Sequence, residues 1–213
     1  MFITSFQIKL LAAILMVIDH LGVIYELSIL RIIGRFAFPL FAWLLIRGIT
    51  YSRDWWRYFK RLCVFAVIAQ PCFMLLPSLV FELNILCLFF LALPLIKFKN
   101  QLTSEQGVIF WSLIAIIAEF SQISYGAYGV GLIGLLACYC EFKEKHFQLW
   151  YLLWVSLSFY GMYRYGFIQG FAFLFCILLP ILEPVKQQGI KARWFYWFYP
   201  LHFLPLSLLK TIH

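Results

Sequence analysis

Long apolar runs separated by short polar breaks dominate the chain. A helix that crosses a bilayer needs about 20 mainly apolar residues, and several runs approach that length. The nine runs cover residues 5–26, 31–50, 61–80, 83–97, 107–123, 127–140, 147–162, 166–182 and 194–210. Backbone polar groups in lipid must find their partners within their own segment, so each run is expected to be helical. The pattern predicts an all-α, polytopic integral membrane bundle of about nine transmembrane helices.

Composition supports this class. Hydrophobic residues make up 64% of the chain and charged residues 12%, with a mean hydropathy of +0.91, whereas soluble domains carry about 25% charged residues. The polar breaks are short, so residues 1–213 are expected to form a single transmembrane domain. The first run lacks a basic leader and a small-residue cleavage site, so it is not expected to be a cleaved signal.

The basic residues predict an orientation. When the sides alternate along the nine runs and residues 51–60 are cytoplasmic, thirteen Lys and Arg fall inside and four outside. This is the bias of the positive-inside rule, and it places the N-terminus in the cytoplasm. It also accounts for the net charge of +8 without a nucleic-acid partner. The inner set is Lys9, Arg47, Arg53, Arg57, Lys60, Arg61, Lys97, Lys99, Lys143, Lys145, Lys186, Lys191 and Arg193.

One run contains two ionisable residues side by side, in LMVIDHLGVI at residues 15–24. Charged groups at membrane depth are costly, which makes Asp19 and His20 functional candidates. His20 lies eleven residues after Lys9, close to three helical turns, so the two share a helix face. Asp19 points about 100° away from His20. It is expected to pair with a cation on another helix.

The second run supplies such cations. Arg31 and Arg35 are four residues apart and share a face, level with Asp19 if the two helices are antiparallel neighbours. Gly34 between them would allow the two backbones to approach closely. Two interpretations stay open: a purely structural Asp–Arg pair with His20 as a bystander, or part of a functional site.

Three further polar residues favour a site. Glu119, Gln70 and His202 each lie in a different predicted helix. A polar cluster drawn from five helices suggests a cavity. The six cysteines lack the spacing of a metal site, so no metal is expected.

Six motifs in chain order give the sequence a likeness to a known family. They are I-D-H-L-G at 18–22, R-x-I-G-R-x-A-F-P-L-F at 31–41, R-G-I-T at 47–50, A-Q-P at 69–71, Y-G-x-Y-G at 125–129 and F-Y-W-F-Y-P-L-H at 195–202. In these the chain resembles the TraX family, named for the F-pilin acetylase, and more distantly the wider transmembrane acyltransferases. Lys9 and His20 reproduce the latter group's first-span pattern of a basic residue, ten residues and a His. Arg31 and Arg35 match its paired arginines loosely.

The resemblance implies acyl transfer from acetyl-CoA to an amine or hydroxyl, in the bacterial inner (cytoplasmic) membrane. The implied acceptors are the N-terminal amine of a pilin or a glycan. The residue types suit this chemistry, because a neutral His can act as base and then as acid, and an Arg can hold phosphates or an oxyanion. The candidate catalytic residues are His20, Asp19, Arg31, Arg35 and His202, and the candidate acetyl-CoA contacts are Lys9, Arg35 and Arg47.

Two other functions remain open from the sequence. A proton-coupled transporter or flippase could use Asp19, Glu119 and the histidines as a relay. A non-enzymatic pilus-assembly protein would keep the polar cluster for structure alone. An inverted repeat would favour transport, and we find none in the sequence.

Overall fold

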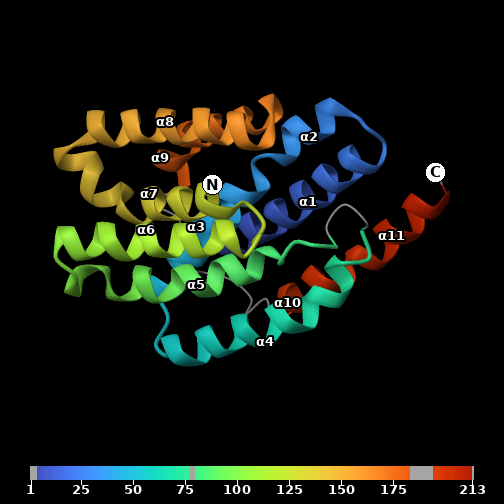
Figure 1. Cartoon of the computed structure of the whole chain (residues 1–213), viewed down its shortest axis with the longest axis horizontal. Coiled ribbons are helices and arrows are strands. Elements are labelled where there is room, and N and C mark those ends of the chain that lie inside the picture. Colours follow the sequence, from blue (N-terminus) through green and yellow to red (C-terminus); the bar gives the residue numbers. More distant parts are fainter. Residues whose placement is uncertain (1–3, 77–79, 183–193, 213) are drawn as a thin grey trace.

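A computed structural model describes residues 4–76, 80–182 and 194–212 of the chain (Figure 1). Every secondary-structure element in these ranges is helical, as the apolar runs predict. The elements are α1 (Ser5–Ile24), α2 (Ser28–Gly34), α3 (Ala37–Thr50), α4 (Trp55–Phe73), α5 (Ile85–Phe98), η2 (Lys99–Gln101), α6 (Ser104–Phe120), α7 (Gly126–Lys145), α8 (Phe147–Tyr165), η3 (Phe167–Leu178), α9 (Leu179–Leu182), α10 (Trp194–Leu201) and α11 (Phe203–Ile212).

Each of the nine predicted runs overlaps one helix or two consecutive helices. Two helical segments in the described ranges are long and apolar enough to cross a membrane, Ser5–Ile24 and Ser28–Thr50. The count of nine crossings stays a prediction. Of the basic residues that define the predicted inner side, Lys186, Lys191 and Arg193 lie outside the described residues.

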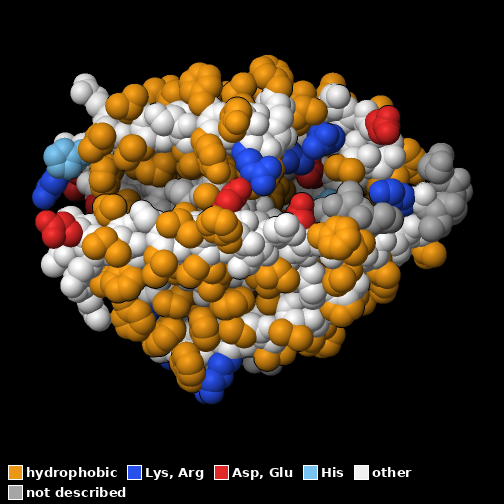
Figure 2. Space-filling model, in the orientation of Figure 1, with side chains coloured by type: hydrophobic (Ala, Val, Ile, Leu, Met, Phe, Trp, Pro, Cys, Tyr) orange, Lys and Arg blue, Asp and Glu red, His pale blue; other side chains and the backbone are white. Residues whose placement is uncertain are grey.

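The molecular surface is unusually apolar. Figure 2 shows hydrophobic side chains over most of the visible face, with charged side chains in small groups between them. Phe120, Val67 and Ile29 are 86%, 74% and 68% exposed. Extended apolar patches are rare on soluble monomers, so this surface suits contact with lipid.

The helices pack as a bundle around α3. α5, α6, α7 and α8 run side by side along the long axis, and α10 and α11 lie against α4 (Figure 1). α3 contacts α1, α5 and α7. Its side chains Leu40, Ala42 and Trp43 are almost fully buried. This central helix begins directly after Arg35, so that residue is placed in the interior of the molecule.

Two glycines bring α1 and α2 into close contact. A Cβ on Gly22 would lie 2.8 Å from the Arg31 Cγ atom, and a Cβ on Gly34 would lie 2.6 Å from the Asp19 Cα atom. Real Cβ atoms do not approach so closely, and only glycine fits at both positions. The close approach expected at Gly34 is confirmed, and it sets Asp19 directly against the arginine helix.

Proline interrupts two helices at candidate site residues. Pro39 has no N–H to donate to the Arg35 carbonyl, and its ring crowds that carbonyl, so α2 and α3 are separate helices. Pro205 acts in the same way on the Leu201 carbonyl, and the chain turns at His202 between α10 and α11. Both breaks lie close to α1.

Candidate functional site

A cavity of about 240 Å³ lies where the two helix breaks meet α1. Its other walls come from the ends of α4 and α8, from η3, and from the loops before α5 and α7. Apolar side chains such as Met16, Phe41, Phe73 and Phe203 form much of the lining. The ionisable lining residues include Asp19, His20, Arg35, Glu82 and Lys210.

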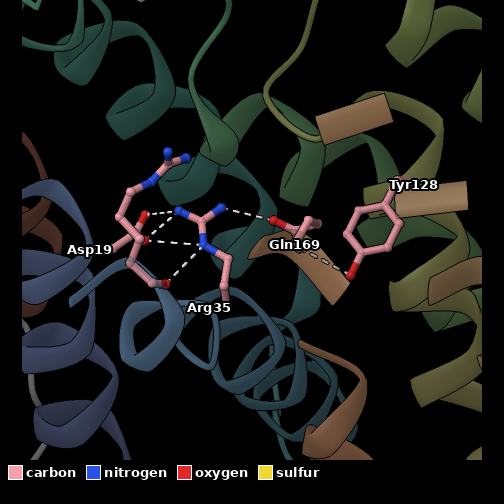
Figure 3. A network of polar contacts seen from close by, with 5 residues as sticks. Asp19, Arg35, Tyr128 and Gln169 are labelled. Carbon is pink, nitrogen blue, oxygen red and sulfur yellow. Dashed lines mark hydrogen bonds and ion pairs between the residues drawn. The ribbon is translucent and has the colours of Figure 1, made fainter. Parts of the chain in front are cut away.

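Arg35 and Asp19 form a buried ion pair in the cavity wall (Figure 3). The Arg35 Nε atom donates to the Asp19 Oδ1 atom at 3.1 Å, and Nη2 donates to both carboxylate oxygens. Nε also donates to the Arg31 carbonyl at 3.3 Å. Asp19 is 8% exposed. The carboxylate is therefore paired with a cation on a neighbouring helix, as its helical position predicts.

A glutamine extends this pair into a chain of hydrogen bonds. The Arg35 Nη1 atom donates to the Gln169 Oε1 atom at 2.8 Å, and the Gln169 Nε2 atom donates to the Tyr128 hydroxyl at 3.2 Å (Figure 3). Gln169 is 2% exposed. It lies on η3, where Gln169, Ala172 and Phe175 are all buried at the three-residue spacing of a 3₁₀ helix.

Two histidines stack beside the ion pair. The ring centroids of His20 and His202 are 5.4 Å apart with an interplanar angle of 21°, and Phe203 packs against both rings. The His202 Nδ1 atom contacts the carbonyl oxygens of Phe198 and Tyr199. Carbonyls only accept hydrogen bonds, so Nδ1 carries a proton. The His202 Nε2 atom is buried and has no hydrogen-bond partner in the described part of the chain.

Two loops hold Glu82, another residue of the cavity wall, in place. Leu83 and Ile123 form a β-bridge between the loops. The Ser124 hydroxyl donates to the Glu82 carboxylate at 3.1 Å. The Gln70 side chain donates to the Glu82 carbonyl at 2.8 Å. Gln70, which the sequence places in the polar cluster, does not line the cavity. It supports the wall through its hydrogen bond to the Glu82 backbone.

Glu119 also lies outside the cavity lining. Its carboxylate accepts from the Arg164 Nε atom at 3.0 Å and from the Ala127 backbone N–H, also at 3.0 Å. The second contact places a negative charge at the N-terminus of α7, where the helix dipole favours it. Glu119 therefore joins the ends of α6, α7 and α8 next to the site.

The structure brings three of the predicted site residues to one cavity: His20, Asp19 and Arg35. His202 contacts the cavity through the ring of His20, and Arg31 contributes its carbonyl to Arg35. Neither of these two lines the cavity.

Lys9 and Arg47 are not part of the cavity lining either. Lys9 lies about 16 Å along α1 from His20, at 1.5 Å per residue. Arg47 lies over the ring of Tyr51 in the last turn of α3, 4.7 Å from its centroid. The structure therefore does not bring the two proposed donor contacts to the histidines.

Sequence reasoning missed several lining residues. Glu82 and Tyr165 lie in none of the six motifs, and Tyr125 belongs to a motif without an assigned role. Lys210 is one of the four basic residues on the predicted outer side, and the sequence assigns it no other role. Gln169 is the clearest omission, because it is the one strongly polar side chain in the apolar run FIQGFAFLFCIL. That isolation is the same signal that identifies Asp19.

The described residues contain no group of three His, Cys, Asp or Glu side chains that could hold a metal ion.

Comparison with known proteins gives one family. The model of the family described as "TraX protein" matches residues 5–210, nearly the whole chain. The chain is also 36% identical over 74 residues to the "Probable fimbrial assembly protein FimC, serogroup H1" of Dichelobacter nodosus. That match covers 32% of this chain and 30% of the relative, so it spans less than a third of the relative's length. No solved structure shows significant similarity to the chain.

Proposed function

The chain belongs to the TraX family, and from this premise we propose that it is a membrane-embedded acyltransferase, which moves an acetyl group from acetyl-CoA to an acceptor amine or hydroxyl. The observation that carries the proposal is that an imidazole, His20, and a guanidinium, Arg35, line one small cavity. Acyl transfer needs a group that moves a proton and a group that stabilises an oxyanion, and these two side chains are of those types.

In the proposed reaction, His20 carries out the proton transfers. In its neutral form it takes the proton from the acceptor nitrogen or oxygen as that atom attacks the thioester carbonyl carbon. The new C–N or C–O bond forms, and the carbonyl becomes an oxyanion. The C–S bond then breaks, and the imidazolium returns the proton to the departing thiolate of CoA. The protein ends the cycle unchanged.

Arg35 suits the oxyanion because its charge is permanent and its position is fixed. Its Nη1 atom carries two N–H groups, and Gln169 takes one of them. The other makes no hydrogen bond within the part of the chain that the structure describes. We assign that N–H to the oxyanion. Asp19 balances the charge of Arg35 in the resting protein.

The size of the cavity limits what enters it. Pockets for drug-sized ligands have volumes of about 300–1,000 Å³, and this cavity is smaller, at about 240 Å³. The proposal therefore places the acetyl thioester end of CoA and the reacting end of the acceptor inside, and the nucleotide outside. Contacts from Lys9 or Arg47 would then be to donor phosphates, remote from the thioester.

A pilin is our candidate acceptor. The relative from Dichelobacter nodosus is named as a probable fimbrial assembly protein, and fimbriae are built from pilins. The proposal includes a bacterial inner-membrane location with several membrane passes and a cytoplasmic N-terminus, as the distribution of Lys and Arg predicts.

Labelled acetyl-CoA tests the function directly. Membranes that contain the protein are incubated with labelled acetyl-CoA and with pilin peptides, amino sugars or hydroxyl sugars, and acetylated products are identified by mass spectrometry. We expect His20→Ala to reduce transfer to background at an unchanged protein level. His146→Ala is the matched control, because His146 is exposed between α7 and α8 and does not line the cavity. Full transfer by His20→Ala would refute the proposal.

A further inference from the structure

The Arg35 guanidinium is held along two of its edges. Asp19 takes the edge formed by Nε and Nη2, and Gln169 takes Nη1. Asp19 comes from α1 and Gln169 from η3, so the two partners approach from different elements (Figure 3). The carboxylate alone would leave Nη1 without a fixed partner inside the protein. Gln169 therefore supplies the fixed partner of Nη1 and helps to hold the plane in which its second N–H lies.

The orientation of the Gln169 amide matters because its two ends differ. Arg35 has only donors, so it can bind the amide oxygen and not the NH₂ group. At the other end, the NH₂ group donates to the hydroxyl of Tyr128, which is 2% exposed. A flipped amide would set N–H against N–H at Arg35 and leave both groups unpaired. Leaving buried polar groups unpaired is unfavourable, so the orientation in the structure is preferred. Arg35 thus fixes which end of the Gln169 amide faces it, and the Tyr128 hydroxyl, which can pair with either end, anchors the other end.

The position of Gln169 supports this role. It lies on a 12-residue 3₁₀ helix, and runs longer than three or four residues are uncommon in this geometry. Its neighbours on the buried stripe, Ala172 and Phe175, offer no polar group. A buried amide is unfavourable unless it is hydrogen-bonded, and here both ends have partners. An apolar side chain would fill this wall equally well, so the amide of Gln169 indicates a role beyond packing.

We propose that Gln169 is a positioning residue that aims the Arg35 guanidinium at the reacting carbonyl, and that Tyr128 anchors the far end of the Gln169 amide. The catalytic part of this inference depends on the acyl transfer proposed above. The structural part, the aiming of Arg35, can be measured without any activity.

Kinetics separates positioning from packing. Gln169→Leu keeps the volume and removes both polar ends, and Gln169→Glu keeps an oxygen for Arg35 while the Tyr128 hydroxyl turns to donate. For positioning, we expect Gln169→Leu to lower kcat about ten- to a hundredfold with little change in KM, and Gln169→Glu to restore most of that loss. A merely structural role predicts the opposite order, because leucine suits an apolar wall and a buried extra carboxylate does not.

Tyr128→Phe provides a second variant that removes one oxygen atom only. We expect a fall in kcat of about two- to tenfold, the value of one hydrogen bond. Combined with Gln169→Leu it should add nothing, since the amide that Tyr128 anchors is then absent. Independent, multiplying effects of the two substitutions would overturn the assignment, as would a wild-type kcat in both single variants.

A measurement without substrate distinguishes this inference from the proposed function. The Nε–Hε resonance of Arg35 in ¹⁵N-labelled protein in detergent is identified by its loss in Arg35→Lys. We expect Gln169→Leu to shift it and speed its exchange with water, and Tyr128→Phe to do so less. If wild-type membranes transfer no acetyl group but the Arg35 resonance changes in these variants, the proposed acyltransferase function is wrong. The positioning of Arg35 by Gln169 is then still supported. An unchanged resonance in both variants refutes the positioning.

Discussion

The polar groups on the two sides of the site differ in how many hydrogen-bond partners they have. On one side, Arg35 donates to a carboxylate, an amide and a carbonyl, and each partner is fixed by the helix that carries it. On the other side, His20 and His202 stack among aromatic rings, and the His202 Nε2 atom has no partner in the described ranges. On the first side Arg35 is held by three partners, and on the second side one ring nitrogen of His202 is unused.

This difference between the two sides leads to different expectations for the free energy of unfolding and for acetyl transfer. A buried charge that loses its partner costs about 3–5 kcal/mol, so removing one partner of the Asp19–Arg35 pair should destabilise the fold. An imidazole between aromatic rings contributes packing that another ring can replace. We therefore expect substitutions on the arginine side to change both the free energy of unfolding and acetyl transfer, and substitutions on the histidine side to change acetyl transfer with little effect on stability.

The largest effect is expected from breaking the ion pair. Arg35→Leu leaves the Asp19 carboxylate buried and unpaired, and should lower the free energy of unfolding in detergent by about 3–5 kcal/mol. Asp19→Leu combined with Arg35→Leu removes both charges and should recover most of this loss, because a well-packed apolar pair is often as stable as a buried ion pair. Acetyl transfer should stay absent in the double variant. If the double variant is no more stable than Arg35→Leu, the pair does not hold α1 against α2 in the way described.

The next effect tests the close packing that brings the pair together. Gly34→Ala places a methyl group against the Asp19 backbone, and overpacking of this kind costs about 1–3 kcal/mol. Gly107→Ala is the matched control, because a Cβ there meets nothing within 4 Å, and alanine is favoured over glycine in a helix by about 1 kcal/mol. Unfolding measurements should show opposite signs for the two variants. Equal stability of both would contradict the packing.

Sequence reasoning found the arginine side in part. Asp19 and Arg35 stand out because charges in apolar runs are rare, and helical geometry places Asp19 away from His20. Gln169 stands out in its run for the same reason but carries no charge. It also lies on a 3₁₀ helix, where buried positions recur every three residues and the α-helical spacing misleads. Its hydrogen bond to Arg35 joins residues 134 apart in the chain, which no local pattern predicts.

The helices themselves follow closely from the apolar runs, with differences at their ends. α4 begins at Trp55, before the predicted start at residue 61, because the Asp54 side chain caps it by accepting from the Arg57 backbone N–H at 2.9 Å. The cavity could not be derived from the runs alone. Glu82 lines it because two loops meet at the Leu83–Ile123 bridge, and that meeting depends on the packing of the whole bundle.

On the histidine side, His202→Phe should leave stability nearly unchanged. The phenyl ring keeps the stack with His20 and loses only the contacts of Nδ1 with two carbonyls, so the free energy of unfolding should change by less than about 1.5 kcal/mol. Acetyl transfer should fall, because the unpaired Nε2 atom beside His20 is gone. A variant with wild-type transfer would show that His202 serves packing alone. A variant that unfolds would remove the contrast between the two sides.

The smallest effect is expected at a second ion pair, which differs from the first in exposure. The Arg164 and Glu119 side chains are 53% and 31% exposed, against 10% and 12% for Arg35 and Asp19. Glu119→Gln removes the charge but keeps an oxygen for the Ala127 N–H, so it isolates the ion pair. Exposed pairs contribute about 0.2–1 kcal/mol, and salt at 1 M screens charges beyond about 3 Å. Raising the salt concentration should therefore narrow the difference in unfolding free energy between wild type and Glu119→Gln, while the loss in Arg35→Leu persists. A loss at Glu119 as large and as salt-resistant as that at Arg35 would show that burial does not separate the two pairs.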